Sequence, residues 1–217
     1  MEIGRKLLLY VLVAVFVMAL CAGCSVSLRP YPNPDNPISR VAVLPLHNKT
    51  ENVTGCEFVR HAFIDLVKAH YYSVMPPGET DQILQDKFGI TLGGQLDLSN
   101  PGIGAPSPQV MGEALGVDGV FYGTLEEFNH IYLMYYEDRR VEVTFIFINS
   151  KTGLTVWEKE AQASNTYSLN RLLNPYAQGL GGMLMSRALG QNPLKEETDE
   201  VMRKLGETLP CGPGYVR

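Results

Sequence analysis

Residues 140–148 read RVEVTFIFI, and after the link NSKTG (149–153) the chain continues as LTVWEKEAQA (154–163). In the first run the apolar side chains at alternate positions share one face of a β-strand: Val141, Val143, Phe145 and Phe147. The link ends in Gly153, and glycine readily supplies the positive φ that a hairpin turn requires. The sequence therefore predicts an antiparallel meander of three strands around this hairpin.

The residues before and after this hairpin predict the rest of a sheet and the helices that cover it. Short apolar or β-branched runs predict strands over 40–46, 72–75, 117–128 and 131–136. Apolar spacing and capping residues predict helices over 55–71, 81–88 behind Thr80, 108–115 behind Ser107, and 195–208. Polar, Gly- and Pro-rich composition predicts loops over 47–54 and 89–106.

This order of elements indicates an α/β (α+β) two-layer sandwich. We expect a mixed sheet of about five strands that contains the antiparallel meander, with helices packed on it. Residues 38–217 are long enough to bury one core, so they are expected to form a single domain. Within it we expect a Gly-rich apolar segment over 171–190 and a C-terminal helix over 194–208.

The N-terminal residues have the features of a targeting signal. An uncharged apolar run of 14 residues, 7–20, follows Arg5 and Lys6. A bilayer span needs about 20 apolar residues, whereas the apolar region of an export signal has about 7–15. The small residues Ala22 and Gly23 then precede Cys24. An exported chain is expected; the alternative is a signal anchor that stays uncut.

The box Cys21-Ala22-Gly23-Cys24 resembles the signal that bacterial lipoproteins carry before their lipid-bearing cysteine. The resemblance implies cleavage before Cys24, which would make 1–23 a signal peptide, and acyl chains on Cys24 as the only attached group. Ser25 at the following position implies the periplasmic face of the outer membrane. Four prolines make 24–37 an extended tether between the membrane and the domain.

Two cysteines, Cys56 and Cys211, remain beyond the lipid-bearing one. In an oxidising periplasm they either form a disulfide, which would tie the C-terminal tail to the start of the first helix, or stay as two separate thiols. The chain has a net charge of −5, whereas a nucleic-acid-binding protein needs clustered positive charge. No nucleic-acid partner is therefore expected.

No catalytic motif stands out. His61 and His70 are expected on opposite sides of one helix, and no metal site is expected. The doublets 126–127 and 137–138 are read as solvated strand ends in preference to paired catalytic carboxylates. Trp157 is expected to anchor the sheet or core.

By elimination, the apolar segment after the meander is the best candidate for an interface, either with a membrane or with a protein partner. The alternative is that it packs on its own sheet. Its candidate contact residues are Leu172, Leu173, Leu180, Met183, Leu184 and Met185. Methionine suits adaptable contacts because its side chain is flexible and polarisable.

Four segments together resemble a known family: residues 41–50, the helix that follows, residues 114–124 and residues 150–157. This pattern is similar to an uncharacterised bacterial lipoprotein family allied to the curli-secretion lipoprotein and the penicillin-binding-protein activator lipoproteins. Their shared domain is similar to the N-terminal domain of the Tol-Pal β-propeller protein. The resemblance covers residues 39–163.

The resemblance implies a non-catalytic assembly module, not an enzyme. We expect a lipid-anchored subunit or adaptor of an envelope complex for assembly, transport or peptidoglycan synthesis, with envelope proteins or further copies of itself as partners. The alternative is a subunit of an oligomeric outer-membrane secretion pore.

Overall fold

The structure is a computed structural model of the 217-residue chain. It describes residues 30–50, 52–90, 106–133, 136–168 and 194–214. The chain divides into two units, Met1–Pro30 and Tyr31–Arg217, and every described helix and strand belongs to the second unit.

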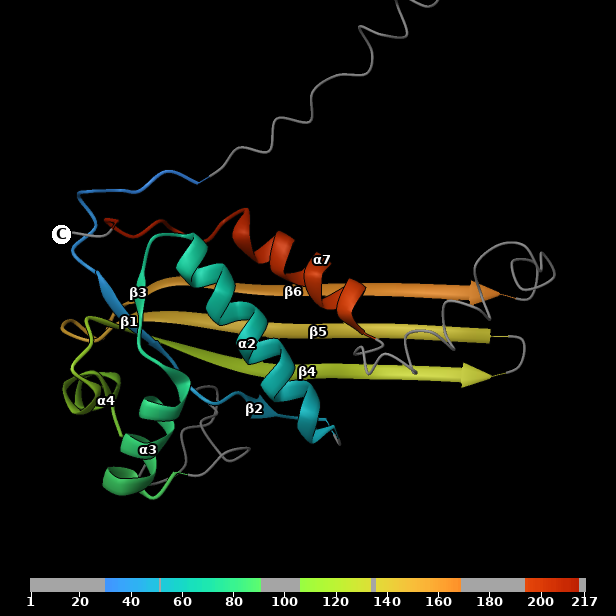
Figure 1. The fold of residues 1–217 in the computed structure, drawn as a ribbon, viewed down its shortest axis with the longest axis horizontal. Helices are drawn as coiled ribbons and strands as arrows, with labels where there is room; N and C mark the ends of the chain where they lie inside the picture. The colour runs from blue at the N-terminus through green and yellow to red at the C-terminus, as the bar shows by residue number, and fades with distance from the viewer. Residues whose placement is uncertain (1–29, 51, 91–105, 134–135, 169–193, 215–217) are drawn as a thin grey trace, which may run out of the picture. The chain divides into compact units, whose positions relative to one another are not determined.

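A mixed six-stranded sheet forms the centre of this unit (Figure 1). Its order is β3-β1-β4-β5-β6, and β2 pairs with β4 beside β1. Strand β1 pairs in parallel with β3 and with β4, and β2 pairs in parallel with β4. Strands β4, β5 and β6 form the antiparallel meander. The strands are β1 Arg40–Val43, β2 His47–Asn48, β3 Ser73–Val74, β4 Gly119–Leu133, β5 Tyr136–Asn149 and β6 Thr155–Ser168. The predicted α+β sandwich with a mixed sheet and a meander is confirmed.

Two strand predictions were wrong. Residues 131–136 are not a separate strand, because β4 continues to Leu133 in register with β5, past an irregularity between Leu125 and Glu127. Residues 47–54 are not all loop, because His47 and Asn48 pair with Thr124 and Leu125 as β2. In both cases the partner strand supplies hydrogen bonds that local sequence does not reveal.

Four helices are described: α2 Val53–Ala69, α3 Pro77–Phe88, α4 Pro108–Leu115 and α7 Lys195–Gly206. The ends of α4 agree with the prediction, since Ser107 Oγ accepts a bond from Val110 N–H and Gly116 ends the helix at φ 64°. The start of α3 does not. It begins at Pro77, and Thr80 lies inside it, with its hydroxyl bonded to the Pro76 carbonyl. Proline suits the first helical position because the N–H it lacks has no partner there.

The helices cover both faces of the sheet. Phe63 of α2 stacks on Phe145 of β5 at 3.6 Å between ring centroids, and Phe121 of β4 stacks on Phe147 at 4.0 Å. Helices α2 and α7 pack on this face (Figure 1). Helices α3 and α4 pack on the opposite face beside β1. The predicted inward face of β5 is confirmed, because all four of its apolar residues are fully buried.

Among the helices that the structure describes, none combines the length and the apolarity needed to cross a bilayer.

Candidate functional site

Two of the predicted sites lie outside the described residues. Cys24 falls in 1–29, and all six candidate interface residues between Leu172 and Met185 fall in 169–193. The lipidation site and the apolar interface therefore stay predictions.

The two remaining cysteines are free thiols, so of the two alternatives the structure has the separate thiols. Cys56 lies in the first turn of α2, whereas Cys211 lies at the opposite end of that helix, where Gly212 N–H bonds to the His70 carbonyl at 2.8 Å. Roughly 14 residues at 1.5 Å each separate Cys56 from His70 by about 20 Å. A disulfide needs Cα atoms within about 7 Å.

Neither thiol is chemically activated. Burial, aided by the charge of Glu57, raises the pKa of Cys56 to about 11. Burial also raises the pKa of Cys211. The thiolate is the nucleophilic form of cysteine, so both side chains are held in their unreactive form at neutral pH.

The histidines face apart, as predicted. His61 is exposed and lies 3.7 Å from Glu57, whereas His70 is buried with its ring nitrogens 2.9 Å from the Leu66 carbonyl and 3.1 Å from that of Gly206. His70 thus joins the ends of α2 and α7. Within the described parts of the chain, no three His, Cys, Asp or Glu residues converge to hold a metal ion.

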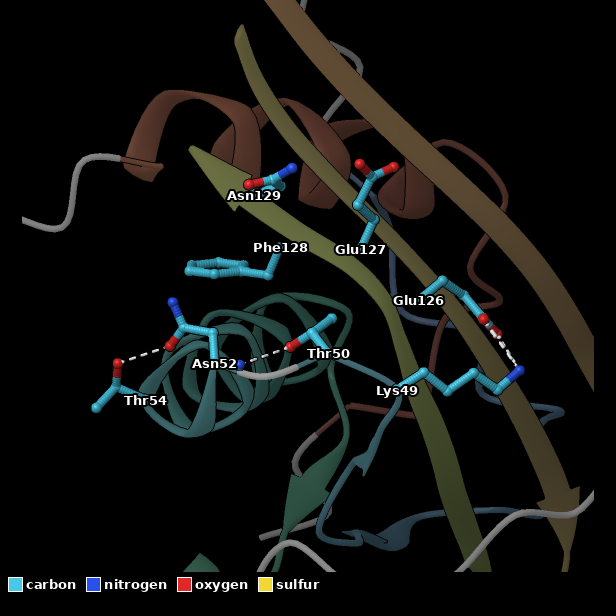
Figure 2. Close-up of a pocket in the computed structure, with 8 residues that line it drawn as sticks. All are labelled: Lys49, Thr50, Asn52, Thr54, Glu126, Glu127, Phe128 and Asn129. Atoms are coloured by element: carbon cyan, nitrogen blue, oxygen red, sulfur yellow. Dashed lines mark hydrogen bonds and ion pairs between the residues drawn. The ribbon is translucent and has the colours of Figure 1, made fainter. Parts of the chain in front are cut away.

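A groove lies between the start of α2 and the middle of β4 (Figure 2). Its lining residues are Lys49, Thr50, Asn52, Thr54, Glu126, Glu127, Phe128 and Asn129. The Asn52 side chain accepts bonds from Gly55 N–H at 3.0 Å and from the Thr54 hydroxyl at 2.9 Å, which caps the helix. Lys49 pairs with Glu126 at 3.0 Å. These polar groups are used in holding the loop.

Within each carboxylate doublet, the two side chains bind different partners. Glu126 pairs with Lys49, and Glu127 lies 3.5 Å from Arg140. Glu137 accepts a bond from Arg139 at 2.8 Å, whereas Asp138 accepts one from Thr166 at 2.9 Å. Neighbours on a strand point to opposite faces, so the Glu137 and Asp138 carboxylates do not face each other. The position of Glu137 and Asp138 near a strand end agrees with the prediction, but their predicted solvation does not, because Asp138 is buried and the Glu137 side chain is 13% exposed.

A network of polar side chains lies between the meander and the first turn of α7, and no pattern in the sequence predicted it. Glu137 binds both Arg139 and His130, the latter at 2.9 Å. Arg139 lies 4.0 Å from Glu197, which is fully buried in the first turn of α7 and accepts a bond from Asn165 at 2.7 Å. The network joins β4, β5, β6 and α7. Its members come from four separate elements, with no local spacing that links them.

Trp157 has the predicted anchoring role. Its ring is buried in the same core cluster as Phe147, its partner across β5 and β6. The indole N–H donates to Thr208 Oγ at 3.2 Å, which ties the sheet to the residues just after α7.

The family "Putative lipoprotein GNA1162-like" matches residues 34–205, which is most of the chain. The chain belongs to the GNA1162-like lipoprotein family. This confirms the predicted resemblance to a bacterial lipoprotein family. No curated protein matches the sequence.

The chain is also similar to several solved structures. Lipoprotein GNA1162 from Neisseria meningitidis is 22% identical, with a TM-score of 0.49, over 70% of this chain and 96% of that chain. A PelC dodecamer from Paraburkholderia phytofirmans is 13% identical, with a TM-score of 0.43, over 81% and 92%. The LpoB C-terminal domain from Escherichia coli is 16% identical, with a TM-score of 0.37, over 58% and 83%. The family assignment rests on the match over residues 34–205.

Proposed function

We propose that this GNA1162-like protein is a lipid-anchored, non-catalytic subunit or adaptor of a cell-envelope complex, held at the periplasmic face of the outer membrane. Membership of a lipoprotein family carries the proposal. The cysteine box ending at Cys24 gives the anchor a specific residue. Assembly, transport and peptidoglycan synthesis are the processes such a subunit would serve.

The physical strength of the anchor supports a permanent membrane location. Each buried methylene of an acyl chain contributes about 0.8 kcal/mol, and two or more chains give stable attachment. Residues 24–37, with their four prolines, would then act as an extended spacer.

The hydrogen bonds and ion pairs of the polar side chains support a non-catalytic role. The described thiols are protonated at neutral pH, and the acidic doublets are bound to Lys, Arg or Thr side chains. A general base or nucleophile needs a free, activated group within reach of a substrate.

Mass spectrometry of the mature N-terminus tests the anchor. We expect a chain that begins at Cys24 with a diacylglyceryl group on sulfur, and we expect Cys24→Ser to lose it. Cys21→Ser is the matched control and should keep the lipid. Finding Met1 still attached, or Cys24 unmodified, would overturn the proposal.

Membrane separation tests the location. The wild-type protein should sediment with the outer membrane, and Ser25→Asp should move it to the inner membrane. Wild-type protein in the inner membrane would contradict the outer-membrane assignment.

A pull-down from detergent-solubilised envelope with a C-terminal tag tests the adaptor role, and specific envelope proteins are expected to co-purify. Leu180→Asp with Leu184→Asp should abolish this capture while the fold is retained. Loss of folding would instead show that this segment packs on its own sheet. Ring-shaped particles that conduct ions in bilayers would identify the alternative, a secretion pore.

A further inference from the structure

The outer edge of β6 is a long strand edge. Strand β6 pairs with β5 along its length, from Thr155 to Ser168, and it ends the order of strands in the sheet. On its other side, no strand among the described residues pairs with it (Figure 1). An edge strand presents a row of N–H and C=O groups that can pair with another chain.

One contact shows which residues direct these groups outward. Lys204 of α7 donates to the Gln162 carbonyl at 2.7 Å, so this carbonyl points away from β5. In an antiparallel pair the residues alternate between bonding the neighbour and pointing away from it. Glu160 and Ser164 therefore direct their N–H and C=O groups outward as Gln162 does.

Within the part of the chain that the structure describes, the middle of this edge is regular and lightly protected. Proteins commonly block an edge with bulges, prolines or charged side chains. The register irregularity of β6 lies at its start, before Trp157, and the strand then pairs without a break to Ser168. Lys204 covers the Gln162 carbonyl, but Glu200 lies 3.8 Å from its amine and can hold it when the carbonyl is needed.

The charge pattern of the edge suits a second copy of the same strand in the opposite direction. Along β6, alternate residues direct their backbone groups outward. The first of these are acidic, Glu158 and Glu160, and the later ones are uncharged, Gln162, Ser164 and Thr166. An antiparallel pair centred on Gln162 places Glu160 opposite Ser164 and Glu158 opposite Thr166. A parallel pair in register would place each Glu against its own copy, and like charges directly opposite are destabilising.

We propose that two copies of this protein pair through the β6 edge, antiparallel and centred on Gln162, so that their sheets join into one. The partner is a second copy of this chain. The pairing does not depend on the lipid anchor.

A cysteine at the two-fold centre tests the pairing in the full-length protein in its native membrane. Facing residues that exchange both backbone bonds have Cα atoms about 5.5 Å apart, within the disulfide range. Gln162→Cys should therefore form a disulfide-linked dimer under mild oxidation, seen on non-reducing gels. Glu158→Cys is the matched control and should show no disulfide-linked dimer on the same gels, whereas adding Thr166→Cys to it should restore the link.

A proline tests whether the edge itself is needed. Ser164→Pro removes an outward N–H, so the domain should keep its circular dichroism spectrum and lose the dimer in light scattering, whereas Ser164→Ala should keep both. If Ser164→Pro fails to fold, the cysteine variants decide. Absence of the Gln162→Cys dimer overturns the proposal, as does finding the Gln162→Cys side chain linked to a different protein.

Discussion

At the scale of single residues, Arg60 is a buried side chain that no sequence pattern singled out. It lies in the middle of α2 and is 1% exposed. Its guanidinium group donates to both oxygens of Asp81, at 2.7 and 2.8 Å, and to the Val43 carbonyl at 2.9 Å. Arginine suits this position because its planar fork matches a carboxylate. One side chain thus holds α2, α3 and the end of β1 together.

We expect Asp81→Ala to lower the free energy of unfolding by about 3–5 kcal/mol, because it leaves a buried cation without its counter-charge. Arg60→Met combined with Asp81→Ala should cost less than Asp81→Ala alone, since the buried charge is then gone. Urea unfolding measures both. Asp65→Ala, which removes an exposed partner of Lys68, is the control and should change stability by less than about 1 kcal/mol. A double variant less stable than Asp81→Ala would contradict this account.

At the scale of elements, α4 is fixed by its close approach to the turn between β5 and β6. A Cβ added at Gly112 would lie 2.0 Å from Ser150 Cβ. The Ser150 hydroxyl donates to the Val117 carbonyl at 2.6 Å, just after α4 ends. The helix can therefore lie against the hairpin only with glycine at this position.

Gly112→Ala should lower the free energy of unfolding by about 1–3 kcal/mol, because the helix must move away from Ser150. Gly78→Ala in α3 is the matched control, since nothing lies within 4 Å of its added Cβ. It should be neutral or stabilising by up to about 1 kcal/mol, as alanine favours helices over glycine. Thermal unfolding of the two variants separates the effect of the close contact from that of helix propensity. Equal changes in stability for the two variants would contradict a role for the contact with Ser150.

At the scale of the whole molecule, the core contains several acids that fold in their neutral form. Burial raises the pKa of Cys56 to about 11 and that of Tyr122 to about 12. Burial also raises the pKa of Tyr72 to about 12, although its bond from Asn36 acts in the opposite direction. In the unfolded chain the same groups lose their protons near 9 and 10. Raising the pH therefore favours the unfolded chain.

We expect the free energy of unfolding to be insensitive to these groups below about pH 8.5 and to fall as pH rises from about 9 to 12. Cys56→Ala should remove part of the decrease between 9 and 11. Tyr122→Phe should remove part of that between 10 and 12 at little cost at pH 7, because its buried hydroxyl has no partner among the described residues. Urea titrations between pH 8 and 12 measure the free energy of unfolding. A free energy of unfolding that rises above pH 9 would contradict the prediction.

The sequence predicted most of the fold through rules that act over a few residues. Alternating apolar residues of β5 indicated its buried face, and Ser107 and Gly116 marked the ends of α4. Prediction from the sequence failed where the structure of one element depends on another element. The residues of β2 become a strand only because β4 lies beside them, and β4 stays one strand to Leu133 because β5 supplies its partners.

By itself the sequence determined the meander, the order of the helices and the cysteine box that resembles a lipoprotein signal, since each depends on neighbours in the chain. Only the tertiary structure decided which side chains meet. It placed Cys56 and Cys211 at opposite ends of α2, and it brought Asp81 to Arg60. The physical reason is that hydrogen bonds and ion pairs act over a few ångströms. Chain folding, not sequence separation, decides which groups come within that distance.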